Sequence, residues 1–121
     1  MILVDTSIWV NHFREGNPVL EQLLNNGDVM CHPFIIGEIA CGNLKNRQEI
    51  LLLLQNLPEA KKASHREIMY FIEQRNLMGK GLGYIDMHLS ASALLTNVRV
   101  WTYDNKLNEV NKHLGIRYLA E

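Results

Sequence analysis

The stretch that decides the fold is MILVDTSIWV, residues 1–10 of a 121-residue chain. Its residues 2–4 form an apolar run without polar alternation, which is typical of a strand buried on both faces of a parallel sheet. Asp5 stands at the carboxyl end of that strand, and Thr6 and Ser7 can both open a helix by accepting a backbone N–H. A carboxylate at such a junction lies on the rim of an open α/β sheet, where these folds bind ligands. A simple helix cap is the alternative interpretation of Asp5, and three later acids weigh against it.

Length and composition indicate a single folded domain over residues 1–121, with 47% hydrophobic and 21% charged residues. No apolar stretch is long enough for a membrane span, and no signal-peptide pattern opens the chain. Cys31 and Cys41 lack a C-x-x-C spacing, so we expect reduced core cysteines and a cytoplasmic protein. The net charge of −1 requires that a nucleic-acid binder concentrate its cations locally.

Apolar periodicity predicts an alternation of strands and helices along the chain. The expected helices cover residues 6–14, 18–24, 33–40, 47–57, 64–76, 85–96 and 105–114. The expected strands cover residues 2–4, 29–31, 98–102 and 116–119, with a polar edge strand at 59–63. Such an alternation predicts a three-layer α/β fold, with a short central parallel sheet flanked by helices.

Four acidic residues occupy positions where chemistry is expected. Asp5, Asp86 and Asp104 lie at a strand's carboxyl end or a helix's amino end, and Glu38 sits inside an apolar helix. Right-handed crossovers bring such ends to the same side of a parallel sheet. The alternatives remain that Glu38 lies on a solvated face and that Asp86 is a cap favoured by the helix dipole.

Four converging carboxylates need a positive partner, because each pair about 5 Å apart costs roughly 3 kcal/mol at an effective dielectric of about 20. All-oxygen ligands favour Mg²⁺ or Mn²⁺ over zinc. The five histidines show no zinc-binding spacing, which argues against a zinc site. Lys45, Arg47 and Lys106 lie near the acids in sequence and are candidate phosphate contacts, with solvated surface charges as the alternative.

Four short motifs follow one another along the chain: VDTS at residues 4–7, Glu38, GYIDMHL at 83–89 and WTYD at 101–104. In this order they resemble the signature of PIN-domain ribonucleases, in particular the VapC toxins of bacterial and archaeal toxin–antitoxin pairs. The resemblance covers essentially the whole chain. It implies a PIN-like fold and a Mg²⁺- or Mn²⁺-dependent endoribonuclease that hydrolyses phosphodiesters of tRNA, ribosomal RNA or messenger RNA.

The resemblance also assigns roles to residues of this chain. The family's acidic catalytic residues map onto Asp5, Glu38, Asp86 and Asp104. We assign the three aspartates to metal binding, and Glu38 to binding through water or to orienting the nucleophile. Thr6 and Thr102 match the family's polar positions beside the metal. Asn105 and Asn108 stand near the position where some members carry a further acid, so this metal site carries less negative charge.

Partners are expected from the same resemblance, which implies a homodimer and a cognate VapB-like antitoxin. An antitoxin segment would lie in an apolar groove and reach toward the acids, often with an arginine, and operator DNA would be contacted only through the antitoxin. Trp9, Phe13, Phe34 and the run at 50–54 offer more apolar surface than a small sheet covers. No membrane partner is expected.

Two other classes of protein fit parts of the pattern. A catalytically inactive PIN-like binding module would use the acids as caps and surface groups, and the intact set of four argues against it. Another metal-dependent phosphoryl-transfer domain, such as a receiver domain, also places acids at strand ends. A receiver domain needs a lysine near a late strand end, and residues 116–119 contain none.

Overall fold

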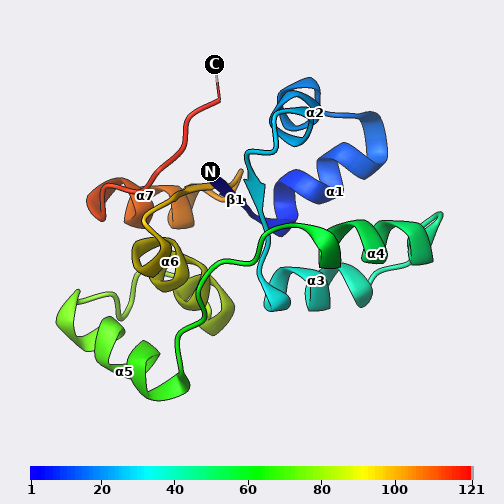
Figure 1. Ribbon diagram of the computed structural model, residues 1–121. Coiled ribbons are helices and arrows are strands. Elements are labelled where there is room, and N and C mark those ends of the chain that lie inside the picture. The colour runs from blue at the N-terminus through cyan, green and yellow to red at the C-terminus, as the bar shows by residue number, and fades with distance from the viewer. Residues whose placement is uncertain (121) are drawn as a thin grey trace.

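The computed structural model describes residues 1–120 and builds a parallel sheet flanked by helices (Figure 1). The strands are β1 (Ile2–Val4), β2 (Val29–Met30) and β3 (Arg99–Trp101), in the order β2-β1-β3. Every residue of the central strand β1 is buried, as its uninterrupted apolar sequence predicts. The predicted α/β fold with a short parallel sheet is therefore confirmed, although β2 and β3 are shorter than expected.

Helices make up most of the remaining chain and cover the sheet. Within residues 1–120 they are α1 (Thr6–Glu15), α2 (Pro18–Asn25), α3 (Pro33–Ala40), α4 (Arg47–Asn56), α5 (His65–Gln74), α6 (Tyr84–Thr96) and α7 (Asn105–His113). Their boundaries follow local signals that the sequence shows. Ser64 and Glu67 form the predicted capping box of α5, with the Ser64 N–H donating to Glu67 Oε1 at 2.9 Å.

The predicted edge strand at 59–63 is wrong. Its backbone makes one parallel bridge, between Glu59 and Cys31, and then leaves the sheet. The next free donor, the N–H of Lys61, bonds to Thr96 Oγ1 at 2.9 Å instead of to a strand. Because that side chain belongs to α6, the ladder ends after a single bridge.

The predicted strand at 116–119 is also wrong, because pairing there is confined to one residue of β3. Val100 donates its N–H to Ile116 O at 2.7 Å and accepts from the N–H of Tyr118 at 2.9 Å. These two bonds form one isolated bridge between Val100 and Arg117. A strand of three residues has no further backbone groups to extend this pairing.

The core lies between the sheet and its helices, and it corrects two sequence predictions. Trp9 is fully buried rather than part of a partner surface, since α1 starts directly at the end of β1 and turns this ring inward. Cys31 is buried in the core as expected, but Cys41 is exposed because it caps the end of α3. Both thiols are free. None of the helices in residues 1–120 has the length and apolar character required to span a bilayer.

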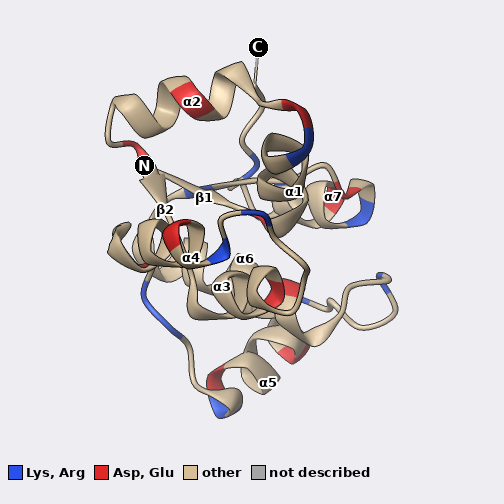
Figure 2. Cartoon of the chain, turned by 90° about the vertical axis from the view of Figure 1, so that its right-hand side faces the viewer, with Lys and Arg blue, Asp and Glu red and all other residues tan. Residues whose placement is uncertain are grey.

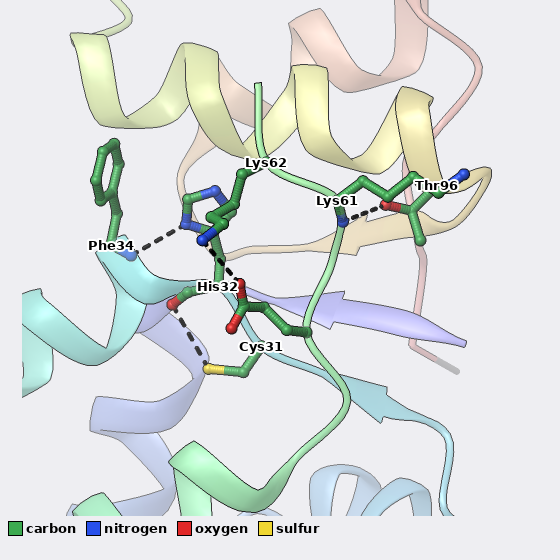
Figure 3. Close-up of polar contacts among 7 residues, drawn as sticks. Cys31, His32, Phe34, Lys61, Lys62 and Thr96 are labelled. Atoms are coloured by element: carbon green, nitrogen blue, oxygen red, sulfur yellow. Dashed lines mark hydrogen bonds and ion pairs between the residues drawn. The ribbon is translucent and has the colours of Figure 1, made fainter. Parts of the chain in front are cut away.

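His32 is a buried polar group at the junction between β2 and α3. Its Nδ1 accepts from the N–H of Phe34 at 3.0 Å and so caps α3, while Cys31 Sγ donates to its carbonyl at 3.8 Å (Figure 3). Burial, followed by the nearby ring of His88, lowers the pKa of His32 from 6.5 to about 4. The cap requires an unprotonated Nδ1, so protonation of His32 breaks the cap and favours the unfolded chain.

This effect of protonation predicts an acid-sensitive step in stability. Between about pH 6.5 and 4, His32 binds a proton in the unfolded chain but stays neutral in the folded protein. The free energy of unfolding therefore falls as the pH falls through this window. His32→Asn keeps a capping acceptor but leaves a cavity. We expect the variant to be less stable at neutral pH and to lose less stability on acidification, measured by urea unfolding. His113→Asn, at an exposed position, is the control and should keep the wild-type pH dependence. Parallel pH profiles for wild type and His32→Asn would contradict this account.

Candidate active site

The carboxyl ends of β1 and β3 are joined at Asp5. Its N–H donates to Trp101 O at 2.9 Å, so the two strands stay paired where the acid begins α1. Asp5 Oδ2 accepts from the Ser7 hydroxyl at 2.9 Å and from Thr102 Oγ1 at 2.7 Å, and Asp5 is almost fully buried. Asp5 is thus the N-cap of α1, as the alternative interpretation had it. Its second oxygen, Oδ1, receives no hydrogen bond from residues 1–120, so capping uses only half of this carboxylate.

Thr102 connects this carboxylate to the next. The buried hydroxyl donates to Asp5 and accepts from the N–H of Asp104 at 3.0 Å. Asp104 in turn caps α7, its Oδ1 accepting from the N–H of Leu107 at 2.9 Å. One hydroxyl therefore fixes the spacing of two acids that are 99 positions apart in the sequence.

Glu38 reaches the same region from α3. It is exposed, as the solvated-face interpretation had it, and its Oε1 accepts from Thr6 Oγ1 at 2.8 Å. Thr6 is the first residue of α1 and directly follows Asp5. The hydrogen bond therefore holds Glu38 beside the start of α1.

Asp86 completes the group from the first turn of α6. Its Oδ2 accepts from the N–H of Gly83 at 3.1 Å, which is the carboxylate half of a capping box. Burial raises the pKa of Asp86, the Gly83 N–H opposes this, and the charges of Asp5 and Asp104 raise it further. Asp5 and Asp104 are therefore near enough for their charges to act on Asp86, and the shared role of the three aspartates stays a prediction.

The four carboxylates share one property, which is that each is only half used. One oxygen accepts the hydrogen bonds given above, and the other accepts none from the part of the chain that the structure describes. Across residues 1–120 the one ion pair is Lys62–Glu59 at 3.5 Å, so no lysine, arginine or histidine there neutralises the acids. The carboxylates are therefore not neutralised by cations of the described chain.

Whether these residues fit a divalent cation depends on the kind of coordination. No three His, Cys, Asp or Glu side chains in residues 1–120 lie close enough together to enclose an ion. Mg²⁺ does not require such a cage, because it keeps several waters and is usually bound by one or two carboxylates. The oxygen donors of this edge therefore fit a hydrated Mg²⁺ or Mn²⁺, and they do not form a closed structural site.

The three candidate phosphate contacts separate in space, and Figure 2 shows lysines and arginines on several elements. Lys45 lies in the turn before α4 and Arg47 is the first residue of α4, where its Nη1 donates to Gly42 O at 3.2 Å. Lys106 instead lies across the glycine-rich loop of residues 79–83. A Cβ atom added to Gly81 in this loop would come within 2.7 Å of the Lys106 Cδ. That loop leads directly to α6, which carries Asp86. Lys106 therefore lies near the acidic edge, meaning the edge that carries Asp5, Asp86 and Asp104, because it also follows Asp104 by two residues.

Ser7 has a larger role than that of the helix opener predicted from the sequence. The Ser7 hydroxyl donates to Asp5 and accepts from the N–H of Tyr103 at 3.1 Å. It therefore ties α1 to the segment after β3. The available signal was the pair of hydroxyl residues after Asp5, because a single cap needs only one of them.

Comparisons with known proteins agree with this arrangement of residues. The sequence profile of the PIN domain matches residues 2–113 of the chain. The chain is 38% identical over 122 aligned positions to Ribonuclease VapC32 of Mycobacterium tuberculosis, in strain CDC 1551 / Oshkosh and in strain ATCC 25618 / H37Rv. Each alignment spans 100% of this chain and 98% of the relative.

The raised pKa of Asp86 predicts that its charge destabilises the metal-free protein. A carboxyl whose folded pKa is raised stabilises the fold at low pH, and this contribution is lost as the pH rises through the folded pKa. Asp86→Asn keeps an acceptor for the Gly83 N–H and removes the charge. In EDTA near neutral pH we expect the variant to melt at a higher temperature than wild type, with the difference shrinking as the pH falls toward 4.

Glu73→Gln, which removes one exposed charge from α5, is the matched control and should melt like wild type. Added Mg²⁺ should raise the midpoint of wild type more than that of Asp86→Asn, since a ligand that binds only the folded state stabilises it. If Asp86→Asn melts at or below the wild-type temperature in EDTA, and Mg²⁺ has no effect, Asp86 acts only as a cap.

Proposed function

Because the chain belongs to the PIN-domain family, in its VapC branch, we propose that it is a Mg²⁺- or Mn²⁺-dependent endoribonuclease that acts as the toxin of a VapBC-type pair. The observation that carries the proposal is the set of four carboxylates with one unbonded oxygen each and no ion-pair partner, two of them after β1 and β3 and the others on α3 and α6. Full-length similarity to Ribonuclease VapC32 supports ribonuclease activity over an inactive binding module or another phosphoryl-transfer domain. RNA of the tRNA, ribosomal or messenger class is the proposed substrate.

In this proposal Asp5, Asp86 and Asp104 hold the metal through their free oxygens or through its waters. Bound Mg²⁺ supplies a more acidic water and charge stabilisation for the phosphodiester that is cut. Thr102 and Ser7 hold Asp5 in one orientation, so that no rotation is needed when the ion arrives. Asp104 is held in the same way by the N–H of Leu107.

Glu38 has a different role in the proposed reaction. Thr6 holds Oε1 of Glu38 and leaves Oε2 available to orient the attacking water or accept its proton. The helices α1, α6 and α7 all begin beside these acids, and helix amino ends favour the negative charge of a phosphate. The chain thus supplies an anion-attracting frame around an acidic centre, which is consistent with phosphodiester cleavage.

An antitoxin is the second proposed partner, and a groove beside α1 suits it. This cavity of about 550 Å³ lies between α1 and the turn before α4 and is lined by Val10, Phe13, Arg14, Gly42, Asn43, Leu44, Lys45, Asn46 and Ile50. An apolar floor with cationic edges fits an amphipathic segment that carries acidic residues. Phe34, Leu52 and Leu53 are further exposed apolar residues, which support a homodimer. The cytoplasmic location expected from the sequence stays a prediction.

The catalytic proposal predicts cleavage that depends on both metal and acids. Purified protein, separated from antitoxin, should cut a structured RNA with Mg²⁺ or Mn²⁺ and stop with EDTA. Asp5→Asn and Asp104→Asn should each lower the cleavage rate by about 10²-fold or more, the size of effect seen when one electrostatic group of an active site is removed. Gel assays with circular-dichroism spectra of each variant would measure this.

Glu73→Gln is again the matched control and should cleave like wild type. Cleavage by the Asp5→Asn protein in EDTA at the wild-type rate would contradict the metal mechanism.

The partner proposal predicts that a substitution can abolish inhibition by the antitoxin without affecting RNA cleavage. Val10→Asp places a charge in the apolar floor of the groove at a position already 36% exposed, so folding and cleavage should persist. The product of the adjacent gene should then bind at least tenfold more weakly and no longer block cleavage. Met78→Asp, on the exposed loop after α5, is the control. Equal inhibition of Val10→Asp and wild type would show that the antitoxin binds elsewhere.

A further inference from the structure

A second cavity lies between the end of α5, the glycine-rich loop and α7. Its volume is about 520 Å³, and its lining is Arg75, Asn76, Leu77, Lys80, Lys106, Glu109, Val110 and His113. Leu77 and Val110 are buried and form an apolar floor. Three permanently charged cations and one histidine face a single carboxylate, so the cavity is strongly cationic in a chain whose net charge is −1.

Helix electrostatics account for only part of this charge. Arg75 caps the C-terminal end of α5 and His113 ends α7, and cations are favoured at both positions by the helix dipole. Lys106 has the opposite placement, in the first turn of α7, where a positive charge is disfavoured. Lys80 lies in the loop and belongs to no helix. The fold itself therefore gives no reason for these two lysines.

The cations also lack carboxylate partners. Glu109 is three residues after Lys106 on α7, at a spacing that permits an ion pair, and Asp104 is two residues before it. Neither lies within ion-pair distance, since the single ion pair of residues 1–120 is Lys62–Glu59. Three cationic side chains around one cavity, with His113 beside them, are left for an anion from outside.

Lys106 links the lining of this cavity to the loop that holds Asp86. Lys106 crosses Gly81, whose φ of 80° and missing Cβ allow the approach, with Nζ of the lysine 3.1 Å from where that Cβ would stand. Two residues past Gly81 the chain reaches Gly83, whose N–H holds Asp86. If an RNA strand lies across Asp86 and Asp104, its neighbouring nucleotide lies over Lys106 and this cavity.

We propose that the cavity of Arg75, Lys80, Lys106 and His113 binds a phosphate of the RNA strand next to the one that is cut. The apolar floor of Leu77 and Val110 lies beneath the attached ribose and base. This inference rests on the proposed function for its substrate, and it adds a subsite that contributes to binding and not to the chemical step. Arg75 and Lys80 are binding residues in this scheme, because neither contacts the reacting atoms.

The test measures RNA binding without cleavage. Full-length protein carrying Asp5→Asn is titrated with a fluorescently labelled single-stranded RNA over a range of KCl concentrations. Arg75→Ala and Lys80→Ala should each weaken binding about three- to tenfold, and each should reduce the slope of log Kd against log salt by about 0.7, the value for one phosphate contact to a single strand. Melting curves establish that each variant is folded, and exposed Lys80 serves if Arg75→Ala unfolds α5.

Lys61→Ala is the matched control, since it removes the same charge at the opposite end of α6, where its N–H contacts Thr96. It should leave affinity and slope unchanged. In the active protein, Lys80→Ala should raise KM and leave kcat unchanged, and a dinucleotide too short to reach the cavity should show no difference. If wild type cuts no RNA but Arg75→Ala and Lys80→Ala still lower the slope, the subsite stands and the proposed function fails. Equal slopes for Lys80→Ala, Arg75→Ala and Lys61→Ala overturn the subsite.

Discussion

The hydrogen bond from Thr102 Oγ1 to Asp5 Oδ2, 2.7 Å long, is the contact on which the rest of the candidate site depends. It joins the ends of β1 and β3 across 97 residues and is buried away from competing water. A charge-assisted bond of this kind is stronger than one between neutral groups. The same hydroxyl accepts from the N–H of Asp104, so the positions of two carboxylates are set by one side chain. Moving either strand would displace both acids.

The three aspartates are helix caps, and their geometry is compatible with a second role as metal ligands. Asp5 and Asp104 are N-caps, and Asp86 is the carboxylate of a capping box. Each cap uses one oxygen, which leaves the other for a ligand. The interpretation of these residues as caps is therefore confirmed, and their interpretation as a metal site stays a prediction. The cost appears at Asp86, where burial and neighbouring charge raise the pKa of the carboxyl group.

Local signals in the sequence predicted most of the fold. An uninterrupted apolar run identified β1, and prolines and the Ser64 capping box placed helix starts, because these effects act within one turn of the chain. The strands expected at 59–63 and 116–119 failed because strand pairing depends on partners that are distant in sequence. Trp9 was misplaced for the same reason, since burial is decided by what packs on a helix. The acids were found from their positions at strand and helix ends, whereas the links through Ser7 and Thr6 required the packed structure.

The central claim is the proposal that Asp5, Asp86 and Asp104 together bind one hydrated divalent cation, through their free oxygens or through its waters. Titration of metal-free, ¹⁵N-labelled protein with substoichiometric Mn²⁺ tests it directly, because the paramagnetic ion broadens the amide signals nearest to it. The account predicts that the signals of Thr6, Asp86 and Asp104 disappear first, and that those at the exposed end of α5 persist. Broadening centred on another part of the chain, such as the Glu59–Lys62 pair, with the signals of Asp5 and Asp86 intact, would contradict it.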